Sequence, residues 1–253
     1  MVLRVLDLFS GIGGFSLGLE RTGGFQTVGF VEQKAFQRRL LRAHWPAARI
    51  YKDVRDVTAS RLSAHGVAPN VVTAGFPCQD LSHAGVRAGI DGDRSGLWRE
   101  VPRIIRELRP DWVLLENVAA ILGRGLNRVL GDLAEVGFDA WWDCIPASFL
   151  GYPHERDRWF AVAYPAGVRR DQGERCAKEW RRLLRARSLG RPSPWAEAAN
   201  NHEVRSGFVR VVDGLPDHVD RLDALGNAVV PEIPEMIGWA ILASLPDPPG
   251  QGA

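Results

Sequence analysis

Apolar, β-branched runs alternate with stretches of helical spacing along the first half of this 253-residue chain. The runs have the length and composition of buried strands, and the helical stretches lie between and after them. The predicted strands cover residues 2–9, 25–32, 49–54, 70–76 and 111–118. This alternation predicts an α/β fold in which a mostly parallel sheet carries helices on both faces. Ligands of such sheets bind at the carboxyl ends of the strands, where the polar and glycine-rich residues of this chain cluster.

The pattern changes after residue 138. Residues 138–147 and 158–164 have strand character, and only about ten residues join them. A parallel crossover normally needs a dozen residues or more, so an antiparallel pair is predicted here. After residue 165 the alternation is lost and the chain becomes rich in arginine, which is typical of a separate module or a large insertion. The apolar stretch 229–245 predicts a last helix that packs back onto the first domain.

Composition narrows the class of protein. Hydrophobic residues make up 45% and charged residues 25%, values that are ordinary for a globular protein and exclude disorder, a collagen-like chain and a disulfide scaffold. No apolar run approaches the roughly 20 residues that cross a bilayer, and the chain begins with a strand-like segment. We therefore expect a soluble, cytoplasmic protein without a targeting signal. Its three cysteines form no C-x-x-C motif and are expected to be free thiols.

Positive charge is concentrated in one segment. The net charge is only +2, but residues 169–191 hold nine basic and three acidic residues. Arginine suits bidentate phosphate contacts. For the chain as a whole, a biased genome composition is the favoured explanation of the excess of arginine over lysine. Residues 169–191 are our candidate for contact with a nucleic-acid backbone, although their helical spacing also fits a solvated helix face.

A glycine turn follows the first predicted strand. Residues 7–20, DLFSGIGGFSLGLE, form a strand end, a turn and a helix start, and glycines let the backbone approach a ligand closely. Counting from Gly11, the third glycine of a dinucleotide fingerprint is replaced by Ser16, so that fingerprint fails. Glu32 ends the second strand and Asp53 follows the third, where carboxylates can accept bonds from ribose hydroxyls. The pattern favours nucleoside binding without a pyrophosphate.

Cys78 follows Pro77 directly at the mouth of the buried strand 70–76. Proline fixes its own φ, so the position of the thiol is well defined. A free cysteine is usually a small buried hydrophobe, and this reading is kept for Cys144 and Cys176. At Cys78, the polar, glycine-containing loop that follows argues against a buried hydrophobic role. Loops of this length are usually functional lids or disordered.

Four further polar residues lie at the same predicted edge. Glu116 and Asn117 end the apolar strand 111–118, and a carboxylate there is costly to bury unless it is paired or protonated. Glu116 could cap the next helix or act as an acid near Cys78. Arg156 and Arg158 precede the strand 158–164, where they could hold a phosphate, lower the pKa of a thiol or pair with a neighbouring acid.

Several short sequence blocks of this chain, taken in order, resemble the motifs of the DNA (cytosine-5)-methyltransferase family. The resemblance covers residues 7–158 and 225–231, most of the chain outside its middle. The matching blocks are DLFSGIGGF, VEQ, KDV, GFPCQ, RSGLW, ENV, GYPHERDR and LGNAVVP. Single blocks are weak, but PCQ, ENV and R-x-R in this order after a glycine turn form a highly specific set.

The resemblance implies a Rossmann-like sheet of an S-adenosylmethionine-dependent methyltransferase, mostly parallel with an antiparallel edge pair. Residues 1–165 would be the catalytic and cofactor-binding domain, completed by residues 225–253, and residues 166–224 a small target-recognition region. Phe9 would lie against the adenine, Glu32 would hold the ribose, and Leu97 would contact the methionine end. The residues implied for the S-adenosylmethionine pocket are Phe9, Gly11, Ile12, Gly13, Gly14, Glu32, Asp53, Val54, Leu97, Asn227 and Ala228.

The resemblance also implies a mechanism. Cys78 would add to carbon 6 of cytosine, Glu116 would hold ring nitrogen 3, and Arg156 and Arg158 would anchor the target and the catalytic loop. The base would be flipped out of double-stranded DNA, and residues 79–95 are the candidate lid over it. We expect a monomer of the restriction–modification type, with no metal, membrane or obligate protein partner.

Other functions stay open to different degrees. Methylation of cytosine in tRNA would use the same blocks, so the sequence does not exclude it. A nicotinamide oxidoreductase is disfavoured by the missing third glycine and by the PCQ and ENV blocks. A non-catalytic DNA-binding relative is disfavoured because Cys78, Glu116 and both arginines are present. His154 stands where the family usually has glutamine, a departure that affects a neighbour of the two arginines.

Overall fold

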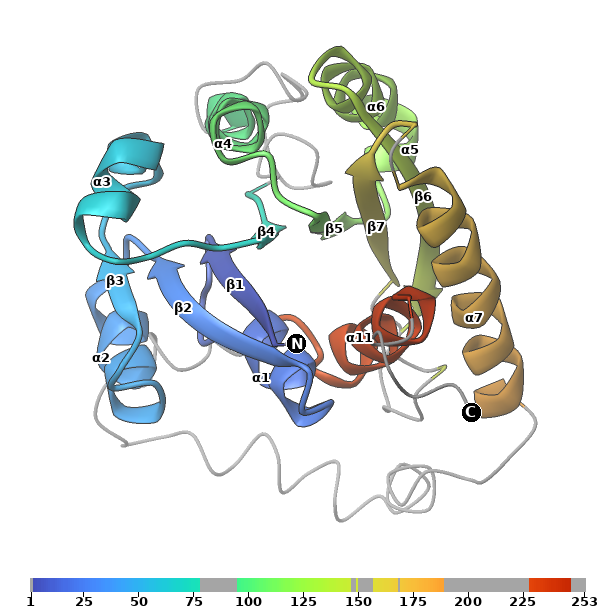
Figure 1. Cartoon of the computed structure of the whole chain (residues 1–253), viewed down its shortest axis with the longest axis horizontal. Helices are drawn as coiled ribbons and strands as arrows, with labels where there is room; N and C mark the ends of the chain where they lie inside the picture. Colours follow the sequence, from blue (N-terminus) through green and yellow to red (C-terminus); the bar gives the residue numbers. More distant parts are fainter. Residues whose placement is uncertain are drawn as a thin grey trace.

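A seven-stranded sheet forms the centre of the protein (Figure 1). The computed structural model describes residues 2–77, 95–146, 149, 157–167, 169–188 and 228–246. Across the sheet the strands follow the order β3-β2-β1-β4-β5-β7-β6. Their bounds are β1 (Leu3–Leu8), β2 (Phe25–Val31), β3 (Arg49–Tyr51), β4 (Val71–Gly75), β5 (Trp112–Val118), β6 (Phe138–Pro146) and β7 (Asp157–Pro165).

Strand directions confirm the predicted sheet. Strands β1 to β5 pair in parallel, whereas β7 is antiparallel to both β5 and β6. The predicted pair at the edge is therefore correct. The chain runs outward from β1 to β3 and then returns to β4 on the other side of β1. This reversal places a topological switch point between β1 and β4, where ligands of such sheets bind.

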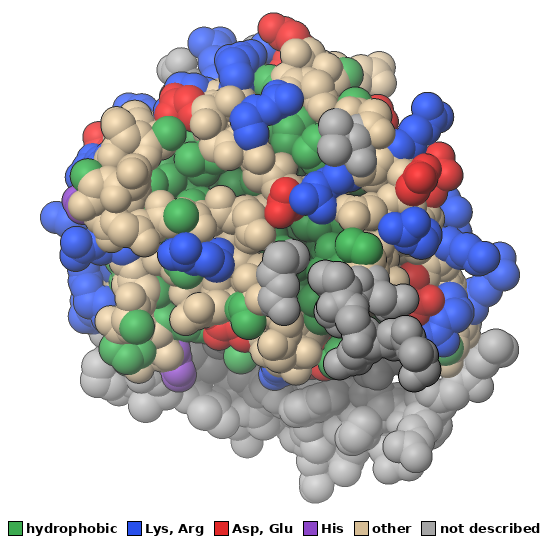
Figure 2. Space-filling model, viewed as in Figure 1, with side chains coloured by type: hydrophobic (Ala, Val, Ile, Leu, Met, Phe, Trp, Pro, Cys, Tyr) green, Lys and Arg blue, Asp and Glu red, His purple; other side chains and the backbone are tan. Residues whose placement is uncertain are grey.

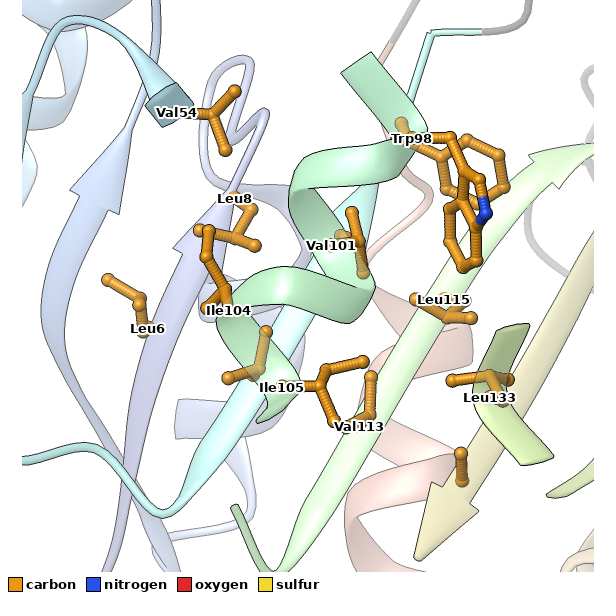
Figure 3. Packing of buried hydrophobic residues seen from close by; sticks show 14 of the residues in the cluster. Leu6, Leu8, Val54, Trp98, Val101, Ile104, Ile105, Val113, Leu115 and Leu133 are labelled. Carbon is orange, nitrogen blue, oxygen red and sulfur yellow. The ribbon is translucent and has the colours of Figure 1, made fainter. Parts of the chain in front are cut away.

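Helices cover both faces of the sheet (Figure 1). On one face, α4 directs Val101, Ile104 and Ile105 onto the strands, a spacing that gives a helix one apolar face (Figure 3). The opposite face is covered by α1, α7 and α11. The helix bounds are α1 (Gly14–Arg21), α2 (Ala35–His44), α3 (Ala59–Ala64), α4 (Glu100–Leu108), α5 (Ile121–Arg124), α6 (Leu126–Glu135), α7 (Arg170–Ser188) and α11 (Glu232–Ser244), with 3-10 turns η1 (Val54–Asp56) and η3 (Ser95–Arg99).

The last helix packs back onto the first domain, as predicted. Helix α11 lies against α1 and α7. The approach to α1 is close because a side chain at Gly18 would overlap the carbonyl oxygen of Pro231. The chain thus returns to the glycine turn after residue 228.

Helix α7 lies within the region predicted to be a target-recognition module. It packs on the sheet through Cys176 and Trp180, both buried, and Trp180 stacks obliquely on Trp141 of β6 at 5.6 Å between ring centroids. Residues 189–224 lie outside the described residues, so the division at residue 166 stays a prediction. Within the described ranges, no helix combines the length and apolarity that crossing a membrane requires.

Candidate active site

Several of the predicted site residues that the structure describes follow the carboxyl ends of neighbouring strands. The glycine turn follows β1, Glu32 follows β2, Asp53 follows β3, and Pro77 follows β4. Figure 2 shows hydrophobic side chains at the surface between α3 and α4, with lysine and arginine side chains around them. The carboxyl ends of parallel strands lie at one edge of a sheet. Residues that are far apart in the sequence therefore come together there in one site.

The turn after β1 has an unusual backbone. Phe9, Gly11 and Gly13 have φ values of 54°, 55° and 88°, in the left-handed region. This conformation costs a non-glycine residue about 1–2 kcal/mol, so Phe9 is held there by its surroundings. A side chain at Gly13 would come within 2.7 Å of the Trp45 ring, whereas one at Gly11 would meet nothing within 4 Å. The turn therefore packs on the protein at Gly13 and is open at Gly11.

Glu32 is fixed against this turn. Its Oε2 accepts a hydrogen bond from the Gly11 amide at 2.8 Å, and its Oε1 accepts one from the Lys34 amide at 2.7 Å. The residue is 9% exposed. A carboxylate has about four lone-pair sites, so two such bonds orient it and leave acceptor capacity for the hydroxyls of a ribose.

The predicted adenine edge forms the turn η1. Asp53 caps this turn and also pairs with the Arg55 guanidinium, which holds the pKa of the Asp53 carboxyl below its ordinary value. Val54 is buried, and its carbonyl oxygen accepts a bond from Arg103 Nη2 at 3.2 Å. Arg103 of α4 thus fixes the turn from behind, a role that the sequence did not indicate.

Two further pocket residues are placed by packing. Leu97 is half-buried against the same hydrophobic cluster as Phe9. Ala228 is half-buried and precedes Val229, whose carbonyl oxygen a side chain at Gly14 would overlap. Val229 therefore lies at the glycine turn, and the place of Ala228 in the cofactor pocket stays a prediction. Asn227 lies outside the described residues.

The strand that leads to Cys78 is tied to its neighbour. Cys78 itself and most of the candidate lid, residues 79–94, lie outside the described residues. The buried side chain of Asn117 donates from Nδ2 to the carbonyl oxygen of Phe76 at 3.1 Å, two residues before Cys78. Gly75 and Glu116 are register partners in the β4–β5 pair. The two strand ends that carry Cys78 and Glu116 are therefore adjacent.

Glu116 pairs with Arg158. Arg158 Nε lies 2.9 Å from Glu116 Oε1, and the two side chains are 20% and 10% exposed. The β5–β7 register produces this pair, because Val118 faces Arg158 and Glu116 is two residues away on the same strand face. Helix α5 begins after Ala120, whose own side chain provides no cap, and the alternative role of Glu116 as a helix cap stays a prediction. Arg156 lies outside the described residues.

Asp7 is a polar residue that the sequence reading missed. It is 1% exposed, and its carboxyl oxygens accept hydrogen bonds from Thr73 Oγ1 at 2.6 Å and Ser16 Oγ at 2.9 Å. Burial raises its pKa to about 7. The available signal was an acid within the mostly apolar run of residues 2–9.

The described residues gather backbone amides, a carboxylate and apolar side chains at the turn after β1. Across residues 2–77, 95–146 and the later described segments, no three His, Cys, Asp or Glu side chains gather as metal ligands would. Backbone amides, the Glu32 carboxylate and apolar side chains can instead hold a small organic molecule beside the Glu116–Arg158 pair.

The known proteins to which this chain is similar are methyltransferases. Residues 3–185 match the family model described as C-5 cytosine-specific DNA methylase. Type II methyltransferase M2.BsuMI of Bacillus subtilis is 34% identical over 169 residues, which cover 64% of this chain and 42% of that protein. Type II methyltransferase M.CviJI of Paramecium bursaria Chlorella virus IL3A is 36% identical over 165 residues, 64% of this chain and 43% of that protein. The match thus spans less than half the length of these relatives.

Solved structures share the fold. A DNA modification methyltransferase encoded within a prophage (E. coli) matches 64% of this chain and 47% of its own with a TM-score of 0.55 and 26% identity. The methyltransferase EhMeth of Entamoeba histolytica matches 96% of this chain and 98% of its own with a TM-score of 0.65. At 12% identity, the second likeness concerns the fold alone.

Proposed function

Because this chain belongs to the C-5 cytosine-specific DNA methylase family, we propose that it transfers a methyl group from S-adenosylmethionine to carbon 5 of cytosine in double-stranded DNA. The Glu116–Arg158 pair carries the proposal. It places a carboxylate and a cation beside the strand end that leads to Cys78, next to a glycine turn with a fixed ribose acceptor.

The pocket fits the proposed cofactor. Gly11 is open on the side where a side chain would stand, and Glu32 presents a carboxylate oriented by two backbone amides. Phe9 and Leu97 offer apolar surface on the same cluster. S-adenosylmethionine, when bound, supplies the electrophilic methyl group.

The nucleophile is assigned to Cys78 by the resemblance and by the two described thiols. Burial raises the pKa of Cys176 to about 12, and burial together with Asp143 raises the pKa of Cys144. Both are therefore poor thiolate sources, because only the thiolate attacks. Cys78 is the remaining cysteine, and it follows Pro77 at the carboxyl end of β4 in the sequence.

The residues divide the chemistry between them. The Cys78 thiolate adds to carbon 6, which raises the electron density at carbon 5, while Glu116 donates a proton to ring nitrogen 3. Carbon 5 then takes the methyl group, and the demethylated donor leaves as S-adenosylhomocysteine. Loss of the carbon 5 proton to solvent and elimination of the Cys78 thiolate from carbon 6 restore the ring, and ring nitrogen 3 returns its proton to Glu116. Arg158 orients Glu116 throughout.

The base must leave the duplex for this attack, at a cost of a few kcal/mol. The names of the curated relatives, both type II methyltransferases, favour a DNA substrate and a place in restriction–modification. We propose a monomer that needs no protein partner. Cytosine in tRNA is the second candidate substrate, because the same blocks occur in that branch of the family.

The experiment is methylation with labelled S-adenosylmethionine on duplex DNA and, separately, on tRNA. Incorporation into DNA, located by bisulfite sequencing, supports the proposal, and incorporation into tRNA alone overturns it. Cys78→Ala should abolish transfer and leave cofactor binding near normal. Cys144→Ala is the matched control and should retain activity. DNA with 5-fluorocytosine at the target should trap a covalent adduct with the wild type, and its absence at saturating enzyme would refute the covalent mechanism.

A further inference from the structure

We propose that Asp7 is a positioning residue that holds the glycine turn of the cofactor pocket in register with the strand that leads to Cys78. The inference rests on the proposed function, since it concerns the relative placement of cofactor and nucleophile. Its geometry, however, lies entirely within the described residues.

Asp7 connects three elements. It lies on β1 and pairs in register with Thr73 of β4, whose hydroxyl donates to Asp7 Oδ1 at 2.6 Å. Its other oxygen, Oδ2, accepts from Ser16 Oγ at 2.9 Å, in the first turns of α1. One carboxyl group therefore links the helix that follows the glycine turn to the strand that ends three residues before Cys78.

Ser10 also holds the glycine turn, through hydrogen bonds to the backbone of Asp7 and of Val31. Ser10 Oγ donates to the Asp7 carbonyl oxygen at 2.5 Å and accepts from the Val31 amide at 3.1 Å. Ser10 N also donates to the Val31 carbonyl oxygen. Backbone and side chain of Asp7 thus fix both ends of the strained segment that contains Phe9 and Gly11.

A purely structural role explains this carboxyl poorly. A buried acid between apolar strands is costly, and an apolar residue of similar size would fill the space without that cost. Glu32, which faces the turn from β2, adds a like charge that makes ionisation of Asp7 less favourable still. An arrangement that keeps the acid despite these costs is typical of a site where geometry matters more than stability.

The experiment removes the hydrogen bond between Thr73 and Asp7 by changing Thr73. Thr73→Val keeps the shape and strand preference of the side chain but loses the donor to Asp7. The matched control is Thr27→Val on β2, because the buried Thr27 hydroxyl has no hydrogen-bond partner within the described part of the chain. Thr73→Ser keeps the hydroxyl and serves as the rescue. Asp7→Asn is measured alongside, but the inference does not depend on its folding.

Two quantities are measured for each variant: the Kd of S-adenosylmethionine by calorimetry, and kcat on duplex DNA. Thr73→Val should raise Kd and lower kcat by about tenfold each, the effect of losing one hydrogen bond to a carboxylate. Thr73→Ser and Thr27→Val should stay within about twofold of the wild type. Hydrogen exchange of residues 9–14 in the ligand-free protein should be faster in Thr73→Val alone.

Three results would overturn the inference. In the first, Thr73→Val behaves like Thr27→Val in both Kd and kcat. In the second, it lowers the Tm while both constants stay unchanged, which would show a structural role only. In the third, kcat falls but Kd and exchange do not change, which would confine the link to β4. Wild-type protein that binds S-adenosylmethionine but methylates no DNA would refute the proposed function, whereas the ratios of Kd and exchange would still test Asp7.

Discussion

Replacing Asp7 by Asn should change how the stability of the protein depends on pH. Asp7 is 1% exposed, and burial is the largest cause that raises its pKa from 3.8 to about 7, with hydrogen bonds from Thr73 and Ser16 opposing it. In the unfolded chain the pKa returns to its ordinary value near 4. Between about pH 4 and 7 the folded protein therefore binds more protons than the unfolded chain.

The sign and size follow from this difference. Stability falls with rising pH wherever the folded state binds more protons, so the contribution of Asp7 is fully present below about pH 4 and lost by about pH 7. About three pH units at roughly 1.4 kcal/mol each give about 4 kcal/mol over the whole window. An asparagine stays neutral throughout. The free energy of unfolding of Asp7→Asn, relative to wild type, should therefore rise by about 2 kcal/mol from pH 5.5 to 7 and stay constant above about pH 7.5.

The assay is urea unfolding of both proteins at half-unit steps from pH 5.5 to 8, followed by tryptophan fluorescence. Subtraction of the two curves removes the other titrating groups, which the proteins share. Thr27→Val, which changes no titratable group, should differ from wild type by the same amount at every pH. A difference between Asp7→Asn and wild type that is constant across this range, or that moves in favour of wild type as the pH rises, would refute the buried acid.

Three other substitutions test the packing and the ion pair. Gly14→Ala should destabilise the protein by about 1–3 kcal/mol in thermal unfolding and weaken cofactor binding, because the added methyl group would overlap the Val229 carbonyl oxygen. Gly131→Ala, in open space on α6, should instead stabilise it by about 0.5–1 kcal/mol, and equal effects at both sites would contradict the packing argument. Arg158→Ala should lower kcat at least about tenfold with the Kd of S-adenosylmethionine unchanged, since it removes the partner of Glu116. An unchanged kcat would exclude an active role for that pair.

The strands could be predicted from the sequence because they are buried on both faces. The predicted segments 2–9 and 111–118 contain β1 (Leu3–Leu8) and β5 (Trp112–Val118), with bounds shifted by one residue at most. A parallel strand covered on both sides needs a nearly continuous apolar run, which is the strongest signal that a single sequence offers. The antiparallel pair followed from connection length alone, because about ten residues are too few for a crossover.

The packing of α7 could not be predicted because its charge hides its apolar face. Gly173, Cys176, Ala177 and Trp180 are buried and have the i, i+3, i+4, i+7 spacing of one helix face. Two of the four are small, and a side chain at Gly173 would overlap the Tyr164 ring. The nine basic residues of the segment 169–191, which contains α7, indicate the exposed side of the helix instead.

The candidate site shows the same limit. Glu116 and Arg158 were each singled out from their places at strand ends, but their pairing was not, because β5 and β7 meet only through the register of the folded sheet. The support of Val54 by Arg103 has the same origin. Sequence position identifies residues at strand ends, whereas the contacts between them are tertiary.

Ser16 links the failed glycine fingerprint to the buried acid. It stands at the position of the third glycine, and its hydroxyl donates to Asp7 Oδ2. A glycine there would leave that oxygen without its donor from α1. The third glycine of a dinucleotide site serves close packing of helix and strand, which Ser16 replaces here by a hydrogen bond. The residue that breaks the dinucleotide fingerprint is therefore also the one that holds α1 to the strand beneath it, and Ser16→Gly should loosen the turn.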